Sequence, residues 1–211
     1  MSILSALIAL IILIFSAILH EIAHGLVAER LGDPTARLMG RLTLNPKNHI
    51  DPMMSIALPL ILLISGSPII FGAAKPVPVD PFNLQDGRKD LALVSLAGPL
   101  TNVLIAIIAS LILKLILNSS YIIPDTLYLI LVTVVHLNLL LAIFNLFPIP
   151  PLDGSKIFAL LLPEKTANLY MSLQSIGFLI IIFLLFFPMG GFSLIGFVST
   201  LLSFSLKLLG L

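Results

Sequence analysis

Residues 3–28 read ILSALIALIILIFSAILHEIAHGLVA, an apolar run whose ionisable side chains are confined to the HEIAH sequence at residues 20–24. As a helix with a rise of about 1.5 Å per residue, this run is long enough to cross roughly 30 Å of hydrocarbon. Two imidazoles and a carboxylate are costly at that depth and are usually kept there for a function. The sequence therefore predicts that the function of the protein lies at residues 20–24.

The composition indicates a polytopic membrane protein. Of the 211 residues, 59% are hydrophobic and 10% are charged, which is far from the composition of a soluble domain. We expect an all-α polytopic membrane protein with five to six membrane segments, in which residues 1–211 form a single membrane-embedded domain. Beyond the first run, apolar stretches occupy residues 53–73, 91–117, 127–147, 169–187 and 192–209.

The charge and the cysteine content exclude several functions. The net charge is +1 and the 11 Lys and Arg residues are spread over short loops, which argues against a nucleic-acid partner. The chain has no cysteine, so disulfides, thiolate ligands and cysteine nucleophiles are ruled out. A metal ion would have to be bound by His, Asp or Glu.

The basic residues predict which loops face the cytoplasm. Residues 29–51 and 75–90 both contain several Lys and Arg, whereas residues 118–126 contain none. Two cytoplasmic loops cannot flank a single complete crossing, so we expect residues 53–73 to enter the bilayer, break near residues 66–68 and return in extended form. The alternative is an ordinary crossing with a basic outer loop.

The HEIAH sequence has the spacing of a metal-binding motif. His20 and His24 are four positions apart, so on a helix they share one face and can bind one ion together. Glu21 is rotated by about 100° from His20, which lets it reach a water on the ion without binding the ion itself. This is the arrangement of H-E-x-x-H, two zinc ligands beside a general base.

A catalytic zinc ion usually has a third protein ligand. Asp153 is the best placed candidate, because the preceding predicted helix runs back toward the cytoplasmic side and the chain then breaks at PIPP, residues 148–151. Gly154 would allow close backbone approach at that point. If Asp153 and Gly154 only form a turn after the helix, His49 and His136 are the alternative ligands.

Three sequence signatures, in this order, resemble those of the site-2 protease family of intramembrane zinc metalloproteases. They are HEIAH at residues 20–24, AGPLTN at residues 97–102, and NLFP at residues 145–148 with LDG at residues 152–154. The resemblance covers residues 15–156, and FGAAKPVPV at residues 71–79 is similar to a segment of a compact prokaryotic subgroup. We expect no PDZ-like or nucleotide-sensing domain. The C-terminal helical pair at residues 168–209 carries no matching motif.

The resemblance implies a site and an activity. It implies that one zinc ion per chain is bound by His20, His24 and Asp153. Glu21 would be the general base, and Asn145 would lie beside the substrate or the oxyanion. The implied reaction is hydrolysis of peptide bonds within or near the transmembrane segments of single-span membrane proteins. The enzyme would be a multi-pass protein of a prokaryotic cell membrane, and the two basic loops predict that its active site lies toward the cytoplasmic side.

Other interpretations of the same residues stay open. A membrane metal-ion transporter would also need buried ligands, although it would not need a base beside them. A catalytically inactive scaffold of the same fold is a further alternative. Gly98 and Asn102, one turn apart, could serve helix packing or contact the active site. The KPVPV sequence at residues 75–79 could pair with an unwound substrate as an added strand.

Overall fold

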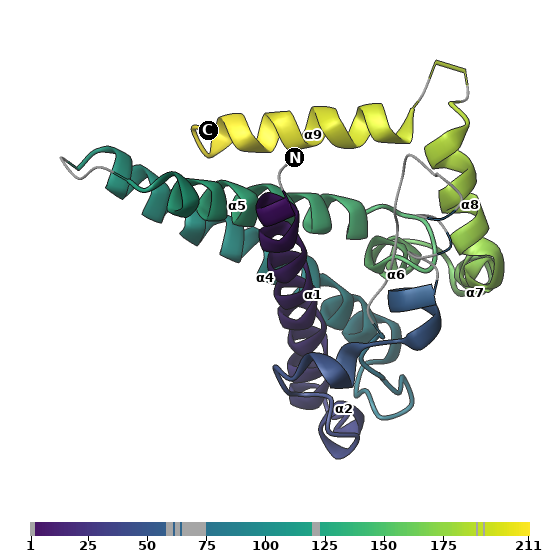
Figure 1. Cartoon of the computed structure of the whole chain (residues 1–211). Coiled ribbons are helices and arrows are strands. Elements are labelled where there is room, and N and C mark those ends of the chain that lie inside the picture. The colour runs from purple at the N-terminus through teal and green to yellow at the C-terminus, as the bar shows by residue number, and fades with distance from the viewer. Residues whose placement is uncertain are drawn as a thin grey trace.

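The computed structural model of the chain is built from helices (Figure 1). It describes residues 3–57, 61, 64, 75–119, 123–188, 190–191 and 193–211, and it contains no strand within them. The predicted all-α class is therefore confirmed for this part of the chain. The elements are α1 (Ile3–Arg30), α2 (Thr35–Leu38), the 3-10 helix η1 (Pro46–His49), the π-helix η2 (Pro52–Ala57), α4 (Gly87–Leu117), α5 (Asp125–Asn145), α6 (Asp153–Leu160), α7 (Glu164–Ser172), α8 (Gln174–Phe186) and α9 (Leu194–Leu208).

Three of these helices, α1, α4 and α5, are long and apolar enough to cross a membrane. Helices α7 and α8 meet at a bend of 65° and would add a fourth span if the pair is one broken span. Helix α9 is apolar but has 15 residues. The length and composition of the described helices thus support three or four spans, and the expected five to six stay a prediction.

Helix α4 lies at the centre of the packing. It contacts α1, α5 and α6, while α9 lies along α5 (Figure 1). Small side chains, which let helix backbones approach closely in a membrane, make up much of its buried face. They include Ala92, Ser95, Gly98, Ala106 and Ala109. Because α1 and α5 both pack against α4, side chains of α4 can contact both helices.

The loop that follows α1 and the segment that precedes α4 meet at one end of the helices. The backbone N–H of Lys75 donates to the carbonyl of His49 at 2.8 Å, and that of Asp80 donates to the carboxylate of Asp33 at 2.7 Å. A single crossing between His49 and Lys75 would separate them by about 30 Å. The two basic loops therefore share one side, as their charge predicts. The predicted break at residues 66–68 lies outside the described residues.

The bounds of the helices differ from the predicted ranges by a few residues. Helix α5 ends at Asn145 rather than at residue 147, because a residue that precedes proline disfavours the helical conformation. The span predicted at residues 169–187 is divided between α7 and α8. The turn before α9 contains Gly190 and Gly191, whose φ angles of +56° and +85° favour glycine.

Candidate metal centre

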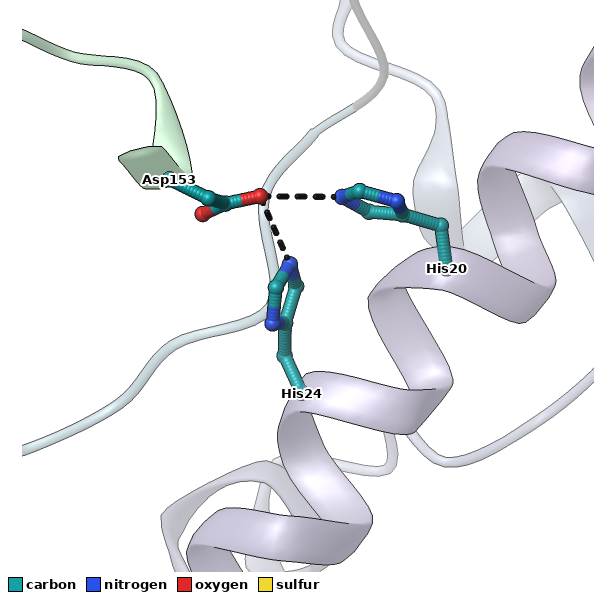
Figure 2. A group of neighbouring side chains, drawn as sticks. All are labelled: His20, His24 and Asp153. Carbon is teal, nitrogen blue, oxygen red and sulfur yellow. Dashed lines mark hydrogen bonds and ion pairs between the residues drawn. The ribbon is translucent and has the colours of Figure 1, made fainter. Parts of the chain in front are cut away.

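Two histidines of α1 and the first residue of α6 form a buried cluster (Figure 2). Nε2 of His20 lies 3.1 Å from Oδ2 of Asp153, and Nε2 of His24 lies 3.2 Å from the same oxygen. One potential ligand atom from each residue lies within 4.8 Å of the other two. The fold thus brings together the three side chains that the sequence predicts as metal ligands.

The backbone of α6 is held where Asp153 can reach α1. A Cβ on Gly154 would lie 2.0 Å from the carbonyl oxygen of Leu146, so the chain returns against the end of α5 at a distance that only glycine permits. At the other end of α6, the guanidinium of Arg88 donates to the carbonyl of Leu162 at 2.8 Å. The close approach predicted at Gly154 is therefore present, and both ends of α6 are fixed.

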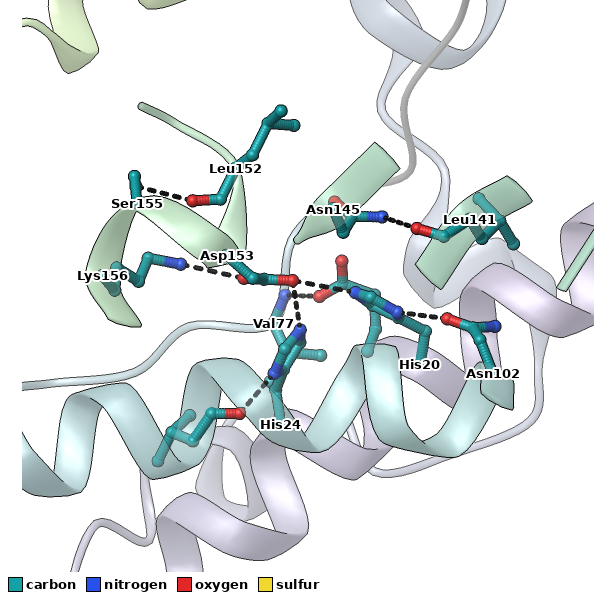
Figure 3. Close-up of polar contacts among 12 residues, drawn as sticks. His20, His24, Val77, Asn102, Leu141, Asn145, Leu152, Asp153, Ser155 and Lys156 are labelled. Carbon is teal, nitrogen blue, oxygen red and sulfur yellow. Dashed lines mark hydrogen bonds and ion pairs between the residues drawn. The ribbon is translucent and has the colours of Figure 1, made fainter. Parts of the chain in front are cut away.

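The carboxylate of Asp153 divides its two oxygens between different partners. Oδ2 faces the two histidines, whereas Oδ1 accepts a hydrogen bond from Nζ of Lys156 at 3.1 Å (Figure 3). The two residues lie three positions apart on α6, a spacing that places side chains on one face. Oδ2 is therefore the oxygen that faces the two histidines and is placed to bind a metal ion with them. The contact of Lys156 was not predicted, although its spacing from Asp153 was visible in the sequence.

The second nitrogen of each imidazole is bonded to an oxygen that can only accept. Nδ1 of His20 lies 2.5 Å from the side-chain oxygen of Asn102, and Nδ1 of His24 lies 2.7 Å from the carbonyl oxygen of Val94 (Figure 3). Both Nδ1 atoms therefore donate, which leaves each Nε2 with a lone pair toward the cluster. Such outer partners orient histidines that bind metals.

Gly98 of α4 keeps the space in front of the two rings open. A Cβ at this position would lie 2.5 Å from Nε2 of His20 and 2.5 Å from Nε2 of His24. Both rings would have to shift to make room for it. Gly98 and Asn102 thus both contact the cluster, which is the second of the two roles considered for them.

Glu21 lies next to the cluster in sequence and contacts the extended segment of residues 75–80. Its Oε2 accepts a hydrogen bond from the backbone N–H of Val77 at 2.7 Å. The Glu21 side chain is half-buried and is not one of the three clustered residues. Because Pro76 and Pro78 have no N–H, a substrate strand added to this segment would compete with Glu21 for the N–H of Val77.

The other candidate residues have partners elsewhere. The amide nitrogen of Asn145 donates to the carbonyl of Leu141, one turn earlier in α5, at 3.0 Å (Figure 3). His49 and His136, the alternative third ligands, each contact a backbone carbonyl in their own loop or helix. Among the residues that the structure describes, they are not grouped with His20 and His24.

The three clustered ligand atoms suit a tetrahedral metal ion. Zinc–ligand bonds of roughly 2.0–2.2 Å place two ligands of a tetrahedral site about 3.3 Å apart. The distances of 3.1 and 3.2 Å from Oδ2 of Asp153 to the histidines are close to that value. Two neutral imidazoles and one carboxylate are also a donor set of catalytic zinc sites. Fold and site together define a helical membrane protein with a buried cluster of two histidines and one aspartate that could hold a metal ion.

Comparison with known families agrees with this class. The family model described as Peptidase family M50 matches residues 8–129 and 123–188 of the chain. The protein belongs to peptidase family M50, the site-2 protease family, as its three signatures predicted. Its apolar helices and its family make it an integral membrane protein.

Several named relatives share the matched region. "Putative zinc metalloprotease YwhC" of Bacillus subtilis is 37% identical over 188 residues, which cover 87% of this chain and 82% of YwhC. The protein Rip2 of Mycobacterium tuberculosis, which carries the same description, is 33% identical over 175 residues, or 80% of this chain and 63% of Rip2. The chain thus spans less than two thirds of that longer relative. No solved structure matches the chain.

Proposed function

We propose that this protein is an intramembrane zinc endopeptidase, which hydrolyses peptide bonds within or near the transmembrane segments of membrane proteins. The observation that carries the proposal is the buried cluster of His20, His24 and Asp153, two of which lie in the apolar helix α1. Relatives named as zinc metalloproteases support the same activity and the same metal. In this proposal the three residues bind one zinc ion per chain.

Glu21 is the general base of the proposed reaction. A zinc ion bound at the cluster would supply Lewis-acid chemistry, polarising the scissile carbonyl and lowering the pKa of water. Glu21 takes a proton from the attacking water and later delivers it to the nitrogen of the leaving amine. The N–H of Val77 holds Oε2 of Glu21, so the other carboxylate oxygen is left for the water.

The depth of the cluster favours a substrate inside the bilayer. The stretch from His20 to Arg30, the last residue of α1, corresponds to about 15 Å of helix. A peptide bond must therefore reach hydrocarbon depth to be cut. A helical substrate must also unwind locally, because its own hydrogen bonds protect the bond. Single-span membrane proteins fit this requirement, and the basic loops favour cleavage on the cytoplasmic side of a prokaryotic cell membrane.

Asn145 and residues 75–79 are the proposed contacts to the substrate. The amide of Asn145, which donates to the carbonyl of Leu141, would turn to donate to the oxyanion. Loss of such a donor typically lowers the rate by about 10²–10³. An unwound substrate would lie along residues 75–79 as an added strand, and it must find donors other than the N–H of Val77.

Variants of Glu21 and of the metal ligands should affect zinc content and cleavage differently, and this difference tests the proposal. Purified Glu21→Gln should keep its zinc yet lose cleavage of a reconstituted single-span substrate, since an amide cannot take up the proton. Asp153→Ala should lose both zinc and cleavage. Glu164→Gln, which changes an exposed carboxylate of α7, is the matched control and should keep both. Cleavage at the wild-type rate by Glu21→Gln would refute the assignment of the base.

The same variants distinguish the protease from a metal-ion transporter. A protease should not move zinc into proteoliposomes, whereas a transporter should do so, and it should do so equally well with Glu21→Gln. Zinc uptake without cleavage of any membrane-protein substrate would therefore replace the proposed function.

A further inference from the structure

A series of buried side-chain hydrogen bonds joins α1, α4 and α5 behind the candidate metal centre. The amide nitrogen of Asn138 donates to the hydroxyl of Ser16 at 2.9 Å, and that of Asn102 donates to Oδ1 of Asn138 at 2.8 Å. The series ends at His20, whose Nδ1 lies 2.5 Å from Oδ1 of Asn102. Asn102 and Asn138 have exposed fractions of 0%. Both amides therefore depend on protein partners.

The partners of Asn138 allow its amide one orientation. Its nitrogen also lies 2.9 Å from the carbonyl oxygen of Val134, an atom that can only accept. If the amide turned over, its oxygen would face this carbonyl and its nitrogen would face the nitrogen of Asn102. Such mismatched pairs are costly between side chains with exposed fractions of 0%. Oδ1 of Asn138 must therefore point at Asn102.

The orientation of Asn138 sets those of Asn102 and His20 in turn, and the carbonyl oxygen of Ser16, a longer contact at 3.5 Å from the nitrogen of Asn102, favours the same orientation. Since Oδ1 of Asn138 can only accept, Asn102 must present its nitrogen to Asn138 and its oxygen to His20. Nδ1 of His20 then has to donate, and Nε2 is left without a proton on the side of the cluster. With the amide of Asn102 reversed, a donor would face Nδ1, and the proton would belong on the nitrogen that a metal needs.

We infer that Asn138 is a positioning residue of the metal centre, which acts through Asn102 to hold His20 with Nε2 free for the metal. The inference rests on the proposed zinc site. It goes beyond the common role of asparagine in membrane helices, which is to link two helices by a hydrogen bond. A residue that only links helices would support the fold, and its loss would leave the zinc affinity of the folded chain unchanged.

Zinc affinity of the full chain in detergent, measured by competition with a chelator, tests this role. Asn138→Leu removes the amide at similar volume and should weaken zinc binding by about tenfold, the lower end of the usual effect of losing an outer partner. Asn138→Asp should bind nearly as well as wild type, because a buried, protonated carboxyl still presents a carbonyl oxygen to Asn102. His136→Leu, on the same helix, is the matched control and should leave the affinity unchanged.

A double substitution separates positioning from general support. Asn102→Ala should weaken zinc binding at least as much as Asn138→Leu, and the double variant should bind no more weakly than Asn102→Ala alone. The inference would be overturned if the double variant lost zinc affinity by the product of the two single losses, or if Asn138→Leu bound zinc as tightly as wild type. Asn138→Ala gives the same comparison if the leucine variant does not fold. Failure of the wild-type chain to bind zinc would instead remove the proposed function.

Discussion

His20 and His24 lie one turn apart on α1, yet different kinds of group hold their rings. Nδ1 of His20 is bonded to the side chain of Asn102, with Asn138 behind it, whereas Nδ1 of His24 is bonded to the backbone carbonyl of Val94. The His20 side of the centre thus depends on particular side chains of α4 and α5. The His24 side depends on the path of the α4 backbone, which no side-chain truncation removes.

Glu21 resembles His24 in this respect. Its partner is the backbone N–H of Val77. The segment that carries this N–H, residues 75–80, is held in turn by the carboxylate of Asp33 and the guanidinium of Arg41. Side-chain substitutions should therefore affect the His20 side of the centre, whereas changes to the backbone should affect the position of Glu21.

The largest effect is expected from Gly98→Ala, which acts on both sides at once. The new Cβ would lie 2.5 Å from Nε2 of both histidines, which forces both rings to move away from the positions in which they face Asp153. We expect the variant to lose essentially all zinc and all cleavage, measured by metal analysis and a substrate assay. Gly196→Ala is the matched control, because its Cβ would meet its nearest neighbour, Cβ of Ser193, at an ordinary 3.5 Å. A zinc-loaded Gly98→Ala would show that zinc binding does not depend on these positions of the rings.

The next largest effect is expected from Val77→Pro, which should change the position of Glu21 without changing the zinc ligands. Val77→Pro removes the N–H that holds Glu21 in a segment whose extended backbone accepts proline. A hydrogen bond to a charged group contributes about 1.5–3 kcal/mol, so cleavage should fall roughly 10- to 100-fold, while zinc content stays at the wild-type level. Val77→Ala retains the N–H and serves as the control. If Val77→Pro also lost its zinc, the base and the ligands would not be held independently.

Local patterns explain which features could be predicted from the sequence. The four-residue spacing of His20 and His24 fixes their common face as soon as the run is helical, and the prolines before Asp153 mark the place where the chain leaves α5. The 65° bend between α7 and α8 was missed, because hydropathy reports the length of an apolar stretch and not its direction. For the same reason, hydropathy alone does not determine the number of spans.

Contacts between distant segments explain what could not be predicted. The hydrogen bond from Val77 to Glu21 and the one between Asn102 and His20 join residues more than fifty positions apart. No periodicity along one helix reveals such partners. A polar residue inside an apolar helix indicates that its side chain forms a buried hydrogen bond, and Asn102 and Asn138 are both such residues. The sequence does not show which residue is the partner.

The smallest effect on activity is expected from substitution of Asp33. This residue accepts a hydrogen bond from the N–H of Asp80, the last residue of the segment that holds Glu21. Burial favours the neutral acid, but hydrogen bonds from Thr35, from the N–H of Asp80 and from Asn83 outweigh it and hold the pKa of this carboxyl below its ordinary value of 3.8. A lowered pKa in the folded state stabilises the protein above the ordinary pKa, and this stability is lost as the pH falls through the folded value.

Asp33→Asn should therefore lower the melting temperature at neutral pH by a few degrees, on the order of 1–2 kcal/mol, with zinc content unchanged. The difference between wild type and variant should shrink once the pH falls below 3.8. Asp125→Asn, at the exposed start of α5, is the control and should leave the melting temperature at neutral pH nearly unchanged. Asp33 contacts the same extended segment that contains Val77. A modest loss of cleavage without loss of zinc would therefore show that Asp33 helps to position Glu21 through this segment. A loss of zinc would instead show that the metal ligands and Glu21 are not held in place independently.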